Sequence, residues 1–309
     1  MTRLVSAPAV RQRGVILIVL MIVFVLASTS AILVIFDNNI LTRQRDSNVM
    51  LAMRDAKDAL IAYAVLHGDY YSATDGAPGR LICPDTNGDG IEDSPCPGNS
   101  LGRLPVSIIL PSAAVFSFSN FNSGIDEQFW YTLSDDFKRS PTGILNTTSN
   151  GNLSLDGQGG IAAILIAPGG ATGVQLRGNN TSANYLEADN VAGPTYVSSD
   201  ALDPENFNDR VLTITTSEIL SPVSARVAEA MKLELNVFHV LNGIYPLDQA
   251  EFITAMGAAP AWIGANTWVL NTLYTQVTAD SATLAFSNCN IVYTLNVGVP
   301  GISKAGVRC

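Results

Sequence analysis

The sequence has few of the side chains that catalysis and metal binding usually require. It contains only two histidines, His67 and His239, and its four cysteines form no C-x-x-C pair. No G-x-S-x-G or H-E-x-x-H motif occurs, and the glycine-rich stretch "PGGATG" at 168–173 lacks the lysine of a phosphate-binding loop. We therefore predict that the protein is not an enzyme, and that both histidines are packing or surface residues.

Positive charge is also scarce. Charged residues make up 14% of the 309 residues, the formal net charge is −10, and seven of the 17 lysines and arginines lie in the first 57 positions. A surface that binds nucleic acid needs clustered lysine and arginine, so we predict no nucleic-acid partner. The 25 glycines, together with many Asn, Ser and Thr residues, indicate a body rich in strands and loops.

What the sequence does have is one long apolar run near its start. Residues 15–36 carry no charge, and Arg11 and Arg13 stand just before them. A cleavable secretory signal has an apolar core of about 7 to 15 residues. The 22 residues of this run reach the roughly 20 that are needed to cross a bilayer. The run therefore favours a retained anchor over a removable signal, and the two arginines place the N-terminus in the cytoplasm.

The helical pattern continues beyond the apolar run. No glycine or proline occurs from residue 38 to residue 67, and Gly68 then offers a stop. We predict one helix over residues 15–67, about 80 Å long, with a transmembrane half (15–36) and an amphipathic half (37–67). The apolar positions of the second half follow an approximate three–four spacing: Val49, Leu51, Met53, Ala56, Leu60 and Ala64.

The N-terminus resembles that of the type IV pilin superfamily. A short basic leader, residues 1–14, ends in Gly14, and the apolar segment begins at once with Val15. In pilins and pseudopilins a membrane-embedded prepilin peptidase cuts after this glycine. The resemblance implies a cut between Gly14 and Val15, methylation of the new N-terminus, and an α+β fold in which the long helix carries a β-rich, pilin-like body. An ordinary single-pass anchor with an incidental Gly14 is the alternative.

The sequence departs from the major pilins at the fifth residue after the cut. Major pilins carry a glutamate there, whereas this chain has Val19. The K-type minor pseudopilin of type II secretion and some minor pilins share this absence, and "RQRGVILIVL" resembles their N-termini. The resemblance implies a minor subunit of a type IV pilus or a type II secretion pseudopilus, with a periplasmic body. Its partners would be prepilin peptidase, other pilins and inner-membrane lipid. A tethered binding or adhesion module with a plain anchor is the other function class.

Oxygen-bearing side chains alternate along residues 85–93, "DTNGDGIED". Ca²⁺ takes about six to eight oxygen ligands. The predicted ligands are Asp85, Asn87, Asp89, Asp93 and, through its carbonyl, Ile91. The stretch resembles the first nine positions of an EF-hand loop, or a dockerin or thrombospondin-type repeat, and the K-type pseudopilins are calcium binders. Because Cys96 stands at the twelfth position, Glu92 or a distant carboxylate has to complete the shell. We predict a structural Ca²⁺; the alternative is a turn that binds no metal.

The four cysteines fall into two local pairs, Cys83 with Cys96 and Cys289 with Cys309. Four cysteines allow three connectivities, so the sequence alone does not prove this one. Short loops are the easiest to close, and export supplies the oxidising compartment that disulfides need, with four free cytosolic thiols as the alternative. A C-terminal disulfide loop is also typical of type IV pilins.

The remaining sequence predicts a β-rich body over residues 68–220 and a second helix with closing strands over 221–309. Residues 160–169 are expected to form a buried central strand, and 210–219 a half-exposed strand. The second helix is predicted from 221 to 242, with Pro222 in its first turn and Gly243 as its stop. Its expected buried stripe is Val227, Met231, Leu235, Phe238 and Leu241. The segment faintly repeats the end of the long helix, which suggests either a second pilin-like module or a common amphipathic helix.

Overall fold

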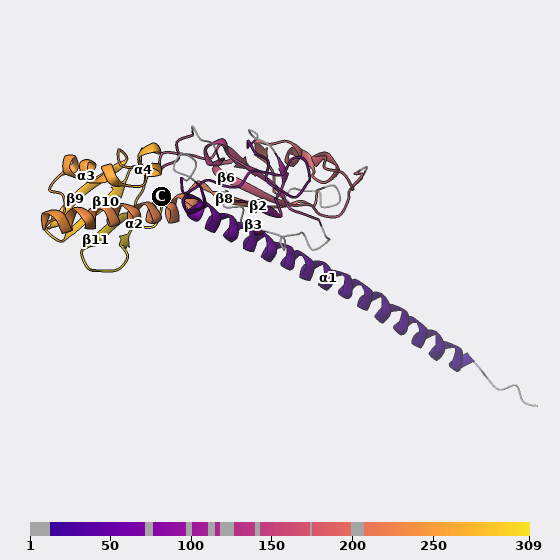
Figure 1. Cartoon of the computed structure of the whole chain (residues 1–309). Helices are drawn as coiled ribbons and strands as arrows, with labels where there is room; N and C mark the ends of the chain where they lie inside the picture. The colour runs from indigo at the N-terminus through magenta and orange to yellow at the C-terminus, as the bar shows by residue number, and fades with distance from the viewer. Residues whose placement is uncertain are drawn as a thin grey trace, which may run out of the picture. The chain divides into compact units, whose positions relative to one another are not determined.

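The computed structural model describes residues 13–71, 77–96, 101–110, 115–117, 127–139, 143–173, 175–198 and 207–309. Within these ranges the side chains of 13–19, 27, 29–43, 109 and 115–117 are not described. The chain divides into two compact units, Met1–Asn48 and Val49–Cys309, each of which is treated by itself. The fold is α+β, with two long helices and two larger sheets (Figure 1).

The first unit contains the N-terminal part of helix α1 (Arg13–Tyr70). Residues 1–12 of the predicted leader lie outside the described residues, and Gly14 and Val15 belong to the first turn of α1. Residues 20–26 are all apolar, and each is between 53% and 72% exposed. Among the described residues, no helix is both long enough and apolar enough to cross a membrane. Most side chains of the predicted 15–36 segment lie outside that description.

In the second unit α1 presents one buried face to the body. Its buried residues include Val49, Met53, Ala56, Leu60 and Ala64. This confirms the predicted stripe except at Leu51, which is 52% exposed. The helix continues three residues past its predicted end at His67, so the predicted stop at Gly68 is wrong. Tyr70 in this extension stacks on Tyr63, with 6.3 Å between ring centroids.

The first sheet has six strands and is mixed, because only β5 and β7 are parallel. Its path is β1 (Gly102–Arg103), β4 (Trp130–Leu133), β6 (Gln158–Ala167), β5 (Leu153–Leu155) and β7 (Thr195–Tyr196), with β8 (Arg210–Thr215) paired to β6. Residues 161–167 of β6 are all buried, so the predicted central strand is confirmed. A separate hairpin consists of β2 (Ser107–Ile109) and β3 (Val115–Ser117). The 3₁₀ helices η1 (Asp135–Phe137), η2 (Ser182–Asn184) and η3 (Ala188–Val191) lie between these strands in the sequence.

Helix α2 (Thr216–Asn242) begins five residues before the predicted start, so the strand predicted at 210–219 is wrong beyond Thr215. Thr215 and Glu218 form a capping box, in which each side chain accepts from the other residue's backbone N–H. This cap starts the helix directly after β8, and Pro222 therefore lies inside the helix and not in its first turn. Gly243, with a φ of 78°, ends the helix as predicted. The predicted domain boundary at residue 220 falls within α2.

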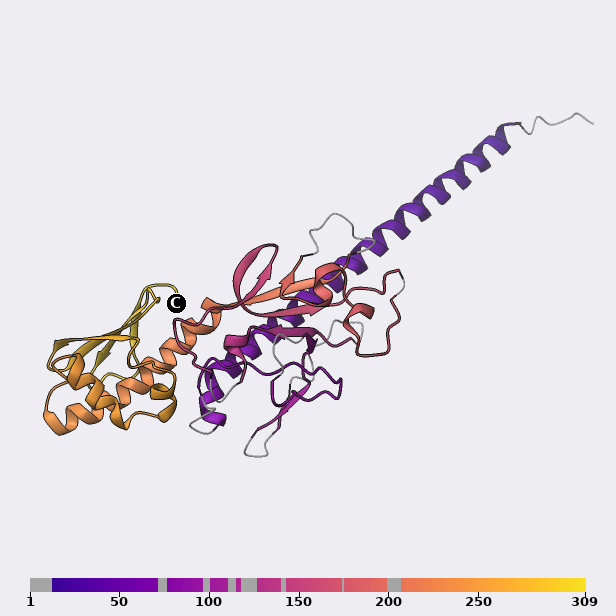
Figure 2. The ribbon, with the colours of Figure 1, turned by 90° about the horizontal axis from the view of Figure 1, so that it is seen from above.

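Helix α2 packs against a four-stranded antiparallel sheet (Figure 2). In spatial order its strands are β12 (Ser303–Ala305), β11 (Val292–Asn296), β10 (Ser281–Phe286) and β9 (Thr272–Thr278). Between α2 and β9 come α3 (Gln249–Ala255), η4 (Met256–Ala258) and α4 (Ala261–Ala265). Val227, Met231 and Leu235 are buried as predicted, but Leu241 is 79% exposed. Phe238 is only half-buried, so the predicted stripe holds for the first three positions and not for the last two. In the same turn His239 is half-buried, with its ring 5.4 Å from that of Tyr245.

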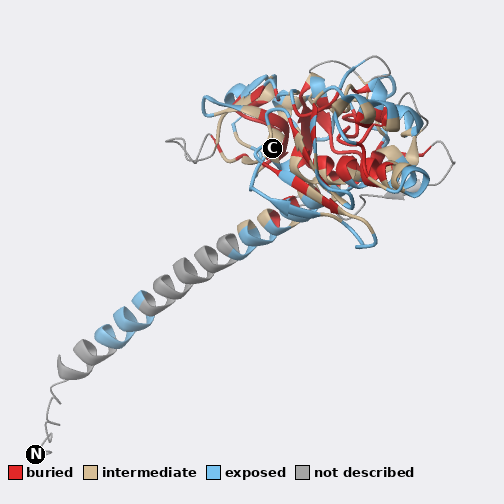
Figure 3. Ribbon diagram, turned by 90° about the vertical axis from the view of Figure 1, so that its left-hand side faces the viewer, coloured by how far each residue is buried: buried red, intermediate tan, exposed pale blue. Residues whose placement is uncertain are grey.

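One apolar core runs through the second unit and includes residues of α1, α2 and both sheets (red in Figure 3). A smaller cluster lies elsewhere on the first sheet and contains Trp130, Ile164, Ile166, Tyr185 and Tyr196. A buried polar contact also ties the loop before β5 to the end of α4. There Leu145 N donates to Asn266 Oδ1 at 2.8 Å, and Asn146 Nδ2 donates to Asn266 O at 3.0 Å. The second helix and sheet are therefore continuous with the body.

Candidate functional site

The predicted calcium loop is closed at its base by a disulfide between Cys83 and Cys96, whose Cα atoms are 5.3 Å apart. Asp85 is fully buried inside it. Its Oδ1 accepts from Gly88 N at 2.6 Å, and its Oδ2 accepts from Gly90 N at 2.7 Å. Both glycines have φ above 80°, a conformation that favours glycine. The loop is thus folded around the Asp85 carboxylate.

The other predicted ligands also bond within the loop. Asn87 Oδ1 accepts from Asp89 N, and Asp89 Oδ1 accepts from Ile91 N, both at 2.8 Å. Asp93 Oδ2 accepts from Thr86 N at 3.0 Å. In the described part of the chain, no group of three or more His, Cys, Asp or Glu side chains is placed to hold a metal ion. The side chains as they stand close the turn on itself and do not form a ligand cage, so calcium binding stays a prediction of the sequence pattern.

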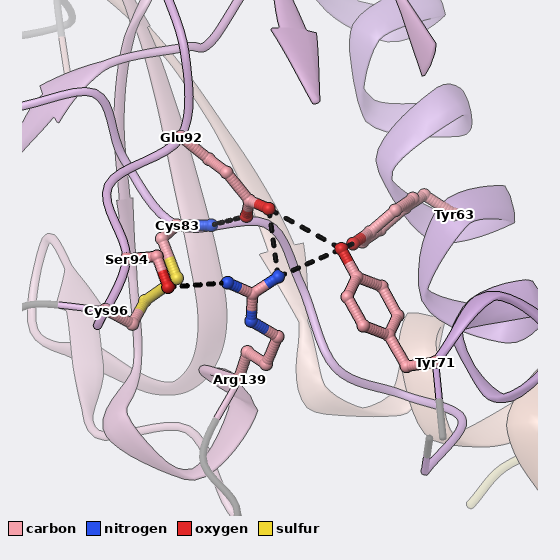
Figure 4. Close-up of polar contacts among 7 residues, drawn as sticks. All are labelled: Tyr63, Tyr71, Cys83, Glu92, Ser94, Cys96 and Arg139. Carbon is pink, nitrogen blue, oxygen red and sulfur yellow. Dashed lines mark hydrogen bonds and ion pairs between the residues drawn. A yellow bond between two sulfur atoms is a disulfide. The ribbon is translucent and has the colours of Figure 1, made fainter. Parts of the chain in front are cut away.

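Glu92 is occupied by an ion pair with Arg139 (Figure 4). Arg139 Nη1 lies 3.0 Å from Glu92 Oε1 and donates to the Tyr71 hydroxyl at 2.9 Å. Its Nη2 donates to Ser94 Oγ at 3.0 Å. The other carboxylate oxygen, Glu92 Oε2, accepts from Cys83 N at 3.3 Å. Glu92 therefore joins the disulfide-closed loop to the end of α1 through one guanidinium group.

This cluster is largely removed from solvent. The Arg139 and Glu92 side chains are 15% and 6% exposed. Burial raises the pKa of Glu92, and the charge of Arg139 together with the hydrogen bonds to the carboxylate opposes that rise. Tyr63 donates to the Tyr71 hydroxyl at 3.2 Å and so extends the network to the buried face of α1. The cluster is an anchor for the loop, and its integrity depends on the ion pair.

The two histidines lie in different surroundings. His67 is fully buried on α1, and its ring stacks on Tyr71 with 4.3 Å between centroids. Burial, with the nearby charges of Arg80 and Arg139, lowers the pKa of His67 to about 3, so the ring is neutral at physiological pH. His239 is half-buried on α2, and its Nε2 lies 2.8 Å from Asp280 Oδ1. His67 is a packing residue, and His239 contacts an exposed carboxylate.

A second buried carboxyl cluster lies where β8 begins. Asp209 is fully buried, and Glu187 is 7% exposed. Asp209 Oδ2 accepts from Glu187 N at 3.0 Å and from Asn190 Nδ2 at 3.1 Å. Burial raises the pKa of Asp209 to about 8, and the Glu187 carboxylate adds to this rise through its charge. The Asp209 carboxyl therefore keeps its proton close to neutral pH.

The second disulfide joins Cys289 to Cys309, so the structure contains both pairings that the cysteine spacing favoured. Cys309 N donates to Ser221 Oγ at 3.2 Å, which fastens the C-terminus to α2. A terminus held in this way does not fray.

Sequence reasoning missed Arg139, Glu187 and Asp209. Arg139 lies 47 positions from Glu92, and Asp209 lies 22 positions from Glu187. Local spacing carries no signal for partners that only tertiary folding brings together. No family model, curated protein or solved structure matches the chain.

Proposed function

We propose that this chain is a minor pilin or pseudopilin, a subunit that is cut after Gly14 by a prepilin peptidase and assembles into a type IV pilus or a type II secretion pseudopilus. The observation that carries the proposal is the Gly14–Val15 junction at the start of a 58-residue helix. The exposed apolar residues 20–26 support it, because an apolar surface of this kind is usually covered by lipid or by a partner. A pilin-like architecture of the body is part of the same proposal.

The proposed subunit lies in the inner membrane with its N-terminus in the cytoplasm and its body in the periplasm. Arg11 and Arg13 before the apolar run support this orientation. The two disulfides are compatible with an oxidising compartment. Val19 favours a minor subunit, because an ionised glutamate in hydrocarbon is costly unless a neighbouring subunit supplies a partner for it. A subunit at a filament tip has no neighbour ahead of it to pair with a glutamate, so an uncharged valine at this position is energetically favoured.

Replacing Gly14 by valine is expected to block the cleavage. The proposed peptidase cuts directly after this glycine, and a β-branched side chain there would obstruct its access to the peptide bond. Mass spectrometry of the membrane-extracted protein should find the wild-type chain starting at an N-methylated Val15. The variant should retain residues 1–14, and its amount in sheared filaments should fall below detection.

Ala9→Val is the matched control, because it adds the same side-chain branch within the leader and should leave cleavage intact. A wild-type chain whose mature N-terminus is any residue other than Val15 would contradict the pilin proposal. Normal cleavage of Gly14→Val would contradict the assigned cutting point.

We further propose that the loop at 85–93 takes up Ca²⁺ from its exposed side, on the strength of the alternating oxygen-bearing residues. Millimolar Ca²⁺ should then raise the thermal midpoint of the wild-type chain above its value in chelator, and Asp89→Ala should remove that increment. Asp85→Ala should also lower the free energy of unfolding by about 3 kcal/mol in the absence of Ca²⁺, because it deletes two hydrogen bonds to a buried carboxylate. If the wild type has the same thermal midpoint in Ca²⁺ and in chelator, the calcium proposal is wrong and the loop is a turn that binds no metal.

A further inference from the structure

A polar cavity of about 570 Å³ opens beside the disulfide-closed loop in the second unit. It is lined by residues 87–88 of that loop, by 127–128, by 178–180 and by Arg103. Apart from two glycines, every lining residue carries an amide, carboxylate or guanidinium group. The volume lies within the range of about 300 to 1,000 Å³ that is usual for small-molecule sites, but the lining is far more polar than is usual there.

The wall of the cavity is held rigidly at Arg103. Its guanidinium carbon lies 4.2 Å from the ring centroid of Trp130 and 4.0 Å from that of Tyr185, so the group is sandwiched between two rings. Arg103 Nε donates to Asn180 Oδ1 at 3.3 Å, and Arg103 Nη1 donates to Gln128 O at 3.2 Å. Arg103 is only 6% exposed. Such fixation reduces the entropy lost when a ligand binds.

The loops on either side of the cavity are tied to each other. Asn180 Nδ2 donates to Thr86 O at 2.7 Å, which joins the 178–180 segment to the disulfide-closed loop. Arg103 N donates to Asp85 O at 2.7 Å, and Asp85 N donates to Arg103 O at 3.0 Å. Gly88 leaves room for this approach, because a Cβ there would lie 3.1 Å from Asn180 Cγ. These hydrogen bonds hold the cavity open in the absence of a ligand.

Two lining side chains keep hydrogen-bonding capacity that no other described residue takes up. The Glu127 carboxylate is 23% exposed and lies 3.8 Å from both Arg103 Nη1 and Arg177 Nη1, which is longer than a hydrogen bond. Within the described ranges, neither the Glu127 carboxylate nor the Gln128 side-chain amide has a hydrogen-bond partner at 3.5 Å or less. Two adjacent residues thus offer two carboxylate acceptors, an amide acceptor and amide donors to whatever enters.

We propose that this cavity, formed by residues 87–88, 127–128, 178–180 and Arg103, is a binding site for a neutral saccharide. Planar carboxylate and amide groups pair with neighbouring hydroxyls, each of which both donates and accepts. The Glu127 carboxylate already stands between two guanidinium groups, where an anionic ligand would otherwise bind, and it would repel a phosphate or an acidic sugar. Among the described residues that line the cavity none has an aliphatic side chain, which disfavours an apolar ligand. This inference does not depend on the proposed role in a filament.

Saturation-transfer NMR on the full chain tests the proposal, with the protein held in a detergent that has no sugar headgroup. The probes are glucose and N-acetylglucosamine as neutral saccharides, and inorganic phosphate as the competitor. We expect saturation of the ring protons of at least one sugar, with no displacement by phosphate. Glu127→Ala should weaken that binding tenfold or more, because it removes the charged acceptor, and Gln128→Ala should weaken it less.

Glu234→Ala is the matched control, because it removes a half-buried glutamate on α2 and should leave sugar binding unchanged. The thermal midpoint of each variant shows whether it is folded. If Glu127→Ala is unfolded, Gln128→Ala carries the test alone. Absence of saturation transfer to both sugars, displacement by phosphate, or binding that the folded variants leave unchanged would each overturn the proposal.

Discussion

Replacing Arg139 by methionine is expected to lower the free energy of unfolding by about 3 kcal/mol, because it leaves the Glu92 carboxylate buried without its counter-charge. The same change removes the donors to Tyr71 and Ser94, so that the end of α1 and the disulfide-closed loop lose their common partner. Urea unfolding of the full chain, followed by tryptophan fluorescence, measures the loss. Because Arg139 opposes the upward shift of the Glu92 pKa, that pKa should rise further in the variant. The deficit should therefore shrink as the pH falls and Glu92 takes up a proton.

Lys138→Met is the control for Arg139→Met. Its partner Asp135 is 41% exposed, and Lys138 itself is 26% exposed, so the change should cost less than about 1 kcal/mol. A double-mutant cycle with Glu92→Gln isolates the energy of the pair from other effects of each substitution. A loss for Arg139→Met as small as that for Lys138→Met would show that the cluster does not anchor the loop.

The elements predicted correctly are those whose cause lies within a few residues. The absence of glycine and proline from residue 38 to residue 67 predicts the long helix, and the three–four spacing from Val49 to Ala64 predicts its buried face. Gly243 marks the end of α2 because a positive φ at that position favours glycine. The start of α2 was mispredicted although its signal was local. The pattern Thr215-x-x-Glu218 is a capping box and starts the helix at Thr216. The helix therefore begins before the position that Pro222, as a first-turn residue, predicts.

The composition of the candidate sites was far less predictable. The alternating pattern predicts Asp85 as a metal ligand, and in the structure its two oxygens accept from the backbone of its own loop, an arrangement that the pattern does not distinguish from coordination. Glu92 was considered only as a metal ligand, because its partner Arg139 lies 47 positions away. The cavity at Arg103 depends on Asn180, which reaches Thr86 across 94 positions. Contacts between residues so far apart in the sequence depend on how the strands pair in the sheet. The spacing of residues along a single sequence does not predict them.

The Asp209 carboxyl should make the stability of the protein fall as the pH rises. Its pKa is about 8 in the folded chain against an ordinary value of 3.8. Between these values the folded state binds a proton that the unfolded state has released, so the free energy of unfolding decreases with pH. The stabilising contribution is complete below about pH 4 and is lost as the pH rises through 8. The loss is spread over the interval between these two pKa values and is steepest between them.

Asp209→Asn should remove this contribution to the slope, so that the stability of the wild type relative to the variant falls from pH 4 to pH 9 and the variant is the more stable of the two at pH 8 and above. The asparagine oxygen keeps the acceptor for Glu187 N and Asn190 Nδ2, while its amide offers a donor beside the Glu187 carboxylate without titrating. Urea unfolding of the full chain at several pH values between 4 and 9 gives both slopes. Asp189→Asn, at an exposed position of η3, is the control and should shift the curve by no more than about 0.5 kcal/mol at any pH. Parallel slopes for the wild type and Asp209→Asn would mean that the buried pair is ionised throughout, and that its charge is compensated within the fold.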